Sequence, residues 1–235
     1  MLKSVFIPNR TNSFAWANLL FLILLIAIGK ITAYTVLFGY FFETIIIGIF
    51  NCFKIYRCSA HEKKSSIGTI LFFCAHYGGF IAVQSIFLFS IFSFSGDGEL
   101  FMEPFHLIDN YQIAIGFEGM HWMLLILFIG QLLKYYFDFL VPKKYTKFTG
   151  KEIMFKPYLR ILIQQFVVIL GGFFIILSEA SIITAILLVI FRFITDFFLV
   201  AIREDSRVLD YLVDKMSETE EDKDEIRKQL LLFSE

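Results

Sequence analysis

Six long apolar stretches restrict this chain to a membrane-embedded fold. Each is long enough to cross a bilayer, which takes about 20 apolar residues in a helix. Lipid permits only helices or closed barrels, and the strand-like alternation of a barrel is absent here. The sequence therefore predicts an all-α integral membrane protein with six transmembrane helices: Ser13–Gly29, Ile31–Phe53, Ile67–Phe94, Gln112–Leu140, Tyr158–Leu177 and Ser181–Ile202.

The placement of Lys and Arg predicts how these spans are oriented. Only 18% of the 235 residues are charged, and basic residues favour the cytoplasmic side of a membrane. They cluster before the first span, after the second, around the link between the fourth and fifth, and after the sixth. A serpentine of six spans brings these four regions to one side. We therefore predict a multi-pass membrane protein with both termini cytoplasmic.

Two domains are expected, a transmembrane bundle over residues 1–202 and a charged, helical cytoplasmic tail over residues 203–235. The acidic loop at residues 95–111 predicts a short cap on the opposite side. In the tail, apolar residues recur at three- and four-residue spacings, which favours a solvated helix or weak coiled-coil self-association. The lipid bilayer is one expected partner. A cytosolic partner for the tail and a homo-oligomer stay open, and nothing indicates nucleic-acid binding.

Polar side chains interrupt the apolar stretches at a common depth. A charged group inside a membrane costs roughly 2.5–3.5 kcal/mol on insertion scales unless the protein interior partners it. At 1.5 Å per helical residue, these side chains lie about 10–15 Å from the cytoplasmic boundary. The alignment predicts a polar layer that binds a ligand or handles protons, with six members in the bundle: Glu43, His76, Gln131, Gln165, Arg192 and Asp196.

A stripe of polar residues leads away from this layer along the second span. Tyr40, Glu43, Asn51 and Lys54 follow the helical period on one face. Their order predicts a polar funnel that opens to the cytoplasm. The alternative is that these groups only specify helix packing, with Arg192 neutralised by Asp196 four residues later.

Cofactor and metal signals are sparse. Glu118 and His121 have the ExxH spacing that puts two ligands on one helical face, but a metal site needs further ligands. Three cysteines without a CxxC pair argue against a disulfide framework or a zinc site. No catalytic motif is present, so the sequence identifies neither a cofactor nor a reaction.

Three motifs carry a resemblance to a known family. They are Tyr40-Phe41-Phe42-Glu43 followed by Ile47–Lys54, His76-Tyr77-Gly78-Gly79-Phe80, and Pro157-Tyr158-x-Arg160 followed by Ile169–Phe173. Together they resemble an uncharacterised family of bacterial multi-span inner-membrane proteins. The resemblance implies histidines in relatives where this chain has Gln131 and Gln165. That difference disfavours a multi-histidine metal site.

Three functional hypotheses follow. The leading one is a carrier-like or sensory protein whose polar layer binds a small polar ligand, an ion or a proton. The second is a structural or assembly protein whose polar layer specifies packing. The third is a membrane-embedded enzyme for a lipid-soluble substrate, with His76 and Glu43 as acid and base. Glu43→Gln is expected to leave stability nearly unchanged under the first hypothesis and to reduce it under the second.

Overall fold

Every element in the described part of the chain is helical. The computed structural model describes residue 7 and residues 13–94, 100–177, 182–201, 207–217 and 219–234. The α-helices are α2 (Ser13–Ala27), α3 (Ala33–His61), α4 (Ile67–Phe94), α5 (Leu107–Ile115), α6 (Met120–Lys134), α7 (Gly150–Phe155), α8 (Pro157–Leu177), α9 (Ile182–Ala201), α10 (Arg207–Met216) and α11 (Glu220–Ser234). A π-helical turn, Tyr135–Leu140, extends α6, and a 3₁₀ turn, Lys144–Thr146, follows it.

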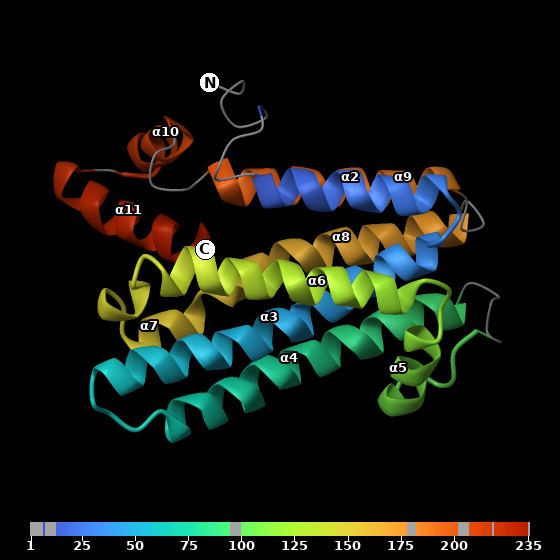
Figure 1. The fold of residues 1–235 in the computed structure, drawn as a ribbon, viewed down its shortest axis with the longest axis horizontal. Helices are drawn as coiled ribbons and strands as arrows, with labels where there is room; N and C mark the ends of the chain where they lie inside the picture. The colour runs from blue at the N-terminus through green and yellow to red at the C-terminus, as the bar shows by residue number, and fades with distance from the viewer. Residues whose placement is uncertain are drawn as a thin grey trace.

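Helix α3 forms the centre of the bundle. It packs against α4, α6, α7, α8 and α9, and the long helices lie side by side along one axis (Figure 1). Helix α2 packs mainly against α9. Residues Val36, Leu37 and Phe38 of α3 are fully buried, as expected for a helix that is apolar on most of its surface and enclosed by others.

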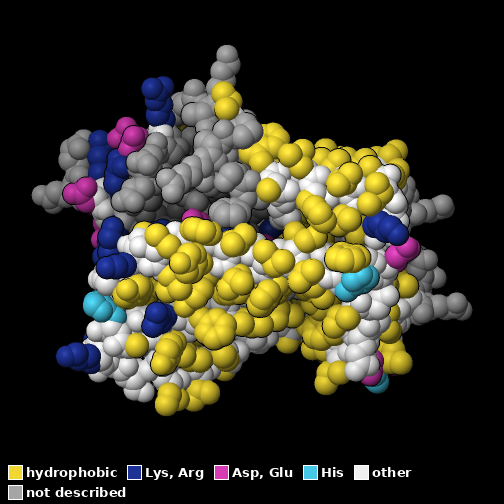
Figure 2. Space-filling model, viewed as in Figure 1, with side chains coloured by type: hydrophobic (Ala, Val, Ile, Leu, Met, Phe, Trp, Pro, Cys, Tyr) yellow, Lys and Arg dark blue, Asp and Glu magenta, His cyan; other side chains and the backbone are white. Residues whose placement is uncertain are grey.

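The lengths and composition of the helices indicate a membrane protein. Three helices in the described residues are long and apolar enough to cross a bilayer, namely Ala33–His61, Ile67–Ser93 and Met120–Leu140. Three shorter apolar helices accompany them, at Trp16–Ala27, Ile161–Leu177 and Ile182–Ile194. Apolar side chains cover the middle of the face shown in Figure 2, and charged groups gather toward its ends. The all-helical class is confirmed for the described residues, and three of the helices could span a membrane. The count of six spans and their orientation stay predictions.

The fourth predicted span is not one helix. The sequence predicted a continuous segment over Gln112–Leu140, but α5 ends at Ile115 and α6 begins only at Met120. Gly119 has a φ of +75°, and a Cβ at this position would lie 2.0 Å from the carbonyl oxygen of Lys30. A glycine with positive φ breaks the helix and lets the chain pass close to the α2–α3 turn.

Two ends of the bundle can be distinguished. One end carries α7, α10 and α11 together with the links α3–α4 and α6–α7 (Figure 1), and we call it the basic end because these links hold Lys63, Lys64, Lys143, Lys144 and Lys147. The opposite end carries α5 (Figure 1). At the opposite end, Asn110 is fully buried and holds the loop before α5 through hydrogen bonds with the backbone of Met102 and Glu103. The acidic segment therefore includes a short helix, and the hydroxyl of its Tyr111 lies 2.5 Å from Oγ of Ser85 on α4.

The tail differs from the predicted solvated extension. Helices α10 and α11 pack against one another through Leu209, Val213 and Ile226, with ion pairs between Lys223 and Asp214 and between Arg227 and Asp210. Helix α11 also contacts α7 and α8. The two tail helices thus form an antiparallel hairpin against the basic end.

Candidate functional site

A buried ion pair joins α3 to α9. The carboxylate of Glu43, 2% exposed, binds the guanidinium of Arg192, 5% exposed. Both lie in the apolar part of the bundle, where an isolated charge would be expensive. The pairing leaves the two side chains without net charge between them, which is how an interior with little water can hold both.

Two further side chains complete this cluster, which we call the polar centre: Tyr40, Glu43, Gln131 and Arg192. Nε2 of Gln131, on α6, donates a hydrogen bond of 3.0 Å to Oε1 of Glu43. The guanidinium of Arg192 lies 4.7 Å from the centre of the Tyr40 ring, a distance at which a cation is attracted to the aromatic face. The polar centre therefore connects α3, α6 and α9.

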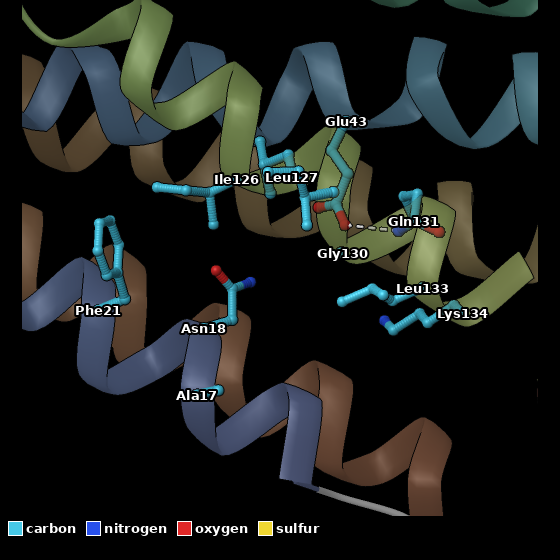
Figure 3. A pocket seen from close by; sticks show the side chains of 11 residues that line it. Ala17, Asn18, Phe21, Glu43, Ile126, Leu127, Gly130, Gln131, Leu133 and Lys134 are labelled. Atoms are coloured by element: carbon cyan, nitrogen blue, oxygen red, sulfur yellow. Dashed lines mark hydrogen bonds between the residues drawn. The ribbon is translucent and has the colours of Figure 1, made fainter. Parts of the chain in front are cut away.

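A pocket of about 240 Å³ reaches the polar centre. It lies between α2 and α6, and Glu43 and Gln131 form its inner wall (Figure 3). Asn18 and Phe21 of α2 face Ile126 and Leu127 of α6 across the space. Most of the lining is apolar, and its polar members are Asn18, Glu43, Gln131 and Lys134. The arrangement offers a few polar contacts at one end of a largely apolar pocket, as small-molecule sites do.

A second space of about 10 Å³ lies on the other side of Asn18, against Tyr40 and Arg192. This volume is on the order of one water molecule. Oδ1 of Asn18 is buried and accepts no hydrogen bond from the described residues. Asn18 thus stands between the large pocket and the Arg192 side of the polar centre.

His76 does not join the polar centre. Its side chain is exposed, and its Nδ1 lies 2.7 Å from the hydroxyl of Tyr158 on α8. Successive helical residues differ by about 100° in direction, and in α4 it is Tyr77 that points inward. Tyr77 donates from its hydroxyl to the carbonyl oxygen of Thr44, at 2.8 Å. The His76 imidazole therefore contacts α8 and not the polar centre, and a ligand-binding or proton-handling role for His76 stays a prediction.

The remaining predicted members of the layer are Gln165 and Asp196, and neither is shown to join the polar centre. Gln165 is half-buried on α8. Asp196 belongs to α9, but its side chain lies outside the described residues, so the predicted Asp196–Arg192 pair stays a prediction. Arg192 itself reaches across to Glu43.

The predicted funnel does not coincide with the pocket. Asn51 is buried, at 3% exposed, and Lys54 lies with its ammonium 5.7 Å from the Phe139 ring. Neither residue lines the space beside Glu43, whose wall continues along α6 to Lys134 instead. Hence the accessible volume next to Glu43 lies toward α2 and α6.

The ExxH pair also loses its geometric basis. Glu118 precedes Gly119, and α6 begins only at Met120, so Glu118 and His121 do not share a helical face. Within the described residues, no group of three or more His, Cys, Asp or Glu side chains could hold a metal ion.

Two amides with buried polar atoms were not selected from the sequence. Asn18 lies five residues into the first apolar stretch, about 7.5 Å deep at 1.5 Å per residue, which is shallower than the predicted layer, and its Oδ1 is buried. Gln84 on α4 is 5% exposed, and neither of its amide atoms has a partner among the described residues. Gln84 precedes another polar residue, Ser85, and nothing in the sequence around it indicated that its side chain is buried.

The comparisons with known proteins supply a family and no activity. A family model described as a family of unknown function, DUF6498, matches residues 1–223. This confirms the resemblance to an uncharacterised family. No curated protein and no solved structure matches the chain.

Proposed function

We propose that this chain, which belongs to the family of unknown function DUF6498, binds a small ligand in the α2–α6 pocket. The ligand's polar group would lie against Glu43 and Gln131, and its apolar part between Phe21 and Leu127. The observation that carries the proposal is the pocket of about 240 Å³ whose inner wall includes the Glu43 carboxylate.

The chemistry of the pocket narrows the class of ligand. Arg192 already neutralises Glu43, so a neutral polar group suits the inner wall better than a free ion. The volume of about 240 Å³ lies below the usual range of about 300–1,000 Å³ for drug-sized ligands. The proposal is therefore a small neutral molecule, or the polar end of a longer amphiphile that extends between α2 and α6.

A pocket-filling substitution tests this proposal. Gly130 lines the pocket, and a Cβ built there meets nothing within 4 Å, so Gly130→Leu should occupy the pocket without a clash. Gly78→Leu is the matched control, because Gly78 also has open space and does not line the pocket. Native mass spectrometry of protein purified in nanodiscs would compare the bound small molecules.

We expect a bound species in the wild type and in Gly78→Leu that is lost in Gly130→Leu. If the same species remain bound in all three proteins, or if none binds the wild type, the pocket is not a ligand site. Comparison with the control separates specific binding from lipid that coats the apolar surface.

A packing role is the second candidate, and a specific observation favours it. The Glu43–Arg192 and Glu43–Gln131 contacts join α3, α6 and α9 directly. In this case the polar centre specifies the register of three helices, and the pocket is a packing defect beside it. Gly130→Leu would then raise thermal stability without removing any bound molecule.

We also propose that six helices cross the bilayer and that the basic end faces the cytoplasm of a bacterial cell. The three shorter apolar helices support the count, because they lie side by side with the three long ones along the same axis (Figure 1). The distribution of Lys and Arg supports the orientation.

A further inference from the structure

Two cysteines distant in sequence meet between α3 and α4. Sγ of Cys52 lies 3.7 Å from Sγ of Cys74, although 22 residues separate them. Both are free thiols, as is Cys58. A disulfide bond is about 2.05 Å long, so the two sulfur atoms need to approach by less than 2 Å. We expect rotation of the two side chains to supply a movement of this size.

The contacts one turn away hold the cysteines in register. Gly48 precedes Cys52 by four residues, and a Cβ on Gly48 would lie 2.6 Å from the Tyr77 ring. Tyr77 follows Cys74 by three residues and donates to the carbonyl oxygen of Thr44 at 2.8 Å. The close approach at glycine and this hydrogen bond fix the spacing of α3 and α4 beside the thiols.

The three cysteines differ in access. Cys74 is exposed, Cys52 is half-buried, and Cys58 is fully buried. Because Cys74 lies on the outer surface of a helix that we place in the membrane, the oxidant that reaches it must be small and uncharged, as hydrogen peroxide is. Cys52 is the thiol beside it. This is the arrangement of a cysteine that is oxidised and a neighbouring cysteine that resolves it.

We propose that Cys52 and Cys74 form a reversible oxidation site for hydrogen peroxide. The sulfur of Cys74 attacks one peroxide oxygen, the O–O bond breaks, and the products are a sulfenic acid and one water molecule. The sulfur of Cys52 then attacks the Cys74 sulfur, the S–OH bond breaks, and a second water leaves. In total two thiols and one peroxide give one disulfide and two waters, and a dithiol reductant restores the thiols by exchange.

The disulfide would bond α3, the helix that carries Glu43, to α4. It would therefore add a covalent link between the central helix and α4 under oxidising conditions. This site does not depend on the ligand proposed above, since neither cysteine lines the α2–α6 pocket.

Peptide mapping of peroxide-treated protein in nanodiscs tests the site. Under non-reducing conditions we expect a Cys52–Cys74 crosslinked peptide in the wild type and in Cys58→Ser, with the bond removed by dithiothreitol. Cys52→Ser should instead accumulate sulfenic acid at Cys74, detected with dimedone. Each variant changes only one sulfur atom to oxygen, and its elution on gel filtration reports whether it is folded.

Three results would overturn the proposal. The first is a Cys58→Ser protein in which both remaining cysteines still react with maleimide after peroxide treatment. The second is a crosslink between two copies of the chain through Cys74. The third is dimedone labelling of Cys58 in preference to Cys74.

Discussion

At the scale of single residues, the Glu43–Arg192 pair governs what a substitution in the polar centre will do. Both side chains are almost entirely buried, so removing one leaves an unpaired charge in an apolar interior. Breaking such a pair costs about 3–5 kcal/mol, whereas replacing both partners is often much less harmful. Glu43→Gln alone therefore destabilises the protein whether or not a ligand binds, and the test expected from the sequence does not separate the hypotheses.

A double-substitution cycle measures the pair. We predict that Glu43→Gln and Arg192→Gln each lower the stability by about 3–5 kcal/mol, and that the double variant loses clearly less than the sum. The measurement is the unfolding free energy in detergent. Glu152→Gln and Lys228→Gln form the control cycle at the exposed pair, 3.7 Å apart, where a coupling of less than about 1 kcal/mol is expected. Additive losses at the buried pair would show that the two charges are not coupled.

Part of the polar centre could be predicted from the sequence. Depth along each apolar stretch was enough to select Glu43, Gln131 and Arg192, because polar groups in lipid must find partners at a common level. Depth alone did not tell His76 from Tyr77, since the two differ by one residue in height and by about 100° in direction. The direction that faces inward depends on which helices pack against α4.

At the scale of elements, the turns restrain the bundle through glycines with positive φ. Gly29 has a φ of +67° and Gly119 a φ of +75°. The N–H groups of Gly29 and Lys30 donate to the carbonyls of Ile26 and Leu25, which closes the end of α2 in a Schellman motif. Only Gly119 also touches another segment, the carbonyl of Lys30.

Alanine at these two glycines separates conformation from packing. Gly29→Ala should cost roughly 1–2 kcal/mol, the penalty of a left-handed alanine, because no atom lies within 4 Å of its Cβ. Gly119→Ala adds an overlap with Lys30 and should abolish the well-folded population. Thermal unfolding and gel filtration of the two variants check this. Equal melting temperatures would mean that the α5–α6 turn does not restrain the α2–α3 turn.

The N-terminus of α7 gives a pH-dependent contribution. The Thr149 backbone N–H, followed by the Thr149 hydroxyl and the Lys228 ammonium, holds the pKa of Glu152 below its ordinary value of 4.5. The Glu152 side chain also completes the capping box with Thr149. Because the folded pKa lies below the unfolded one, this stabilisation is complete above about pH 4.5 and is lost as the pH falls through the folded value.

Glu152→Gln tests this dependence. Glutamine can still complete the capping box but does not titrate, so the melting temperature of the variant should fall less than that of the wild type on acidification. The corresponding difference in unfolding free energy between the two proteins is expected to be on the order of 1 kcal/mol or less, because water reaches the carboxylate. A variant as sensitive to acid as the wild type would assign the pH dependence to other groups.

At the scale of the whole molecule, the two ends of the bundle should lie on opposite sides of the membrane. Lys64 at the basic end has a side chain 72% exposed, and Ile108 on α5 is 73% exposed. In a background with all three cysteines changed to serine, a membrane-impermeant maleimide should label Ile108→Cys in intact cells. It should label Lys64→Cys only after permeabilisation. Labelling of both positions from the same side would exclude the six-span arrangement.

Composition and periodicity by themselves predicted that the chain is helical, that several helices are apolar enough for a membrane and where most of these helices lie. These properties depend on each stretch separately, because lipid requires every backbone group to bond within its own helix. The tertiary structure alone decided that Arg192 bonds to Glu43, that His76 faces outward, that Cys52 meets Cys74 and that a pocket opens between α2 and α6. Such contacts depend on how each helix is rotated about its axis, and only packing against its neighbours sets that rotation.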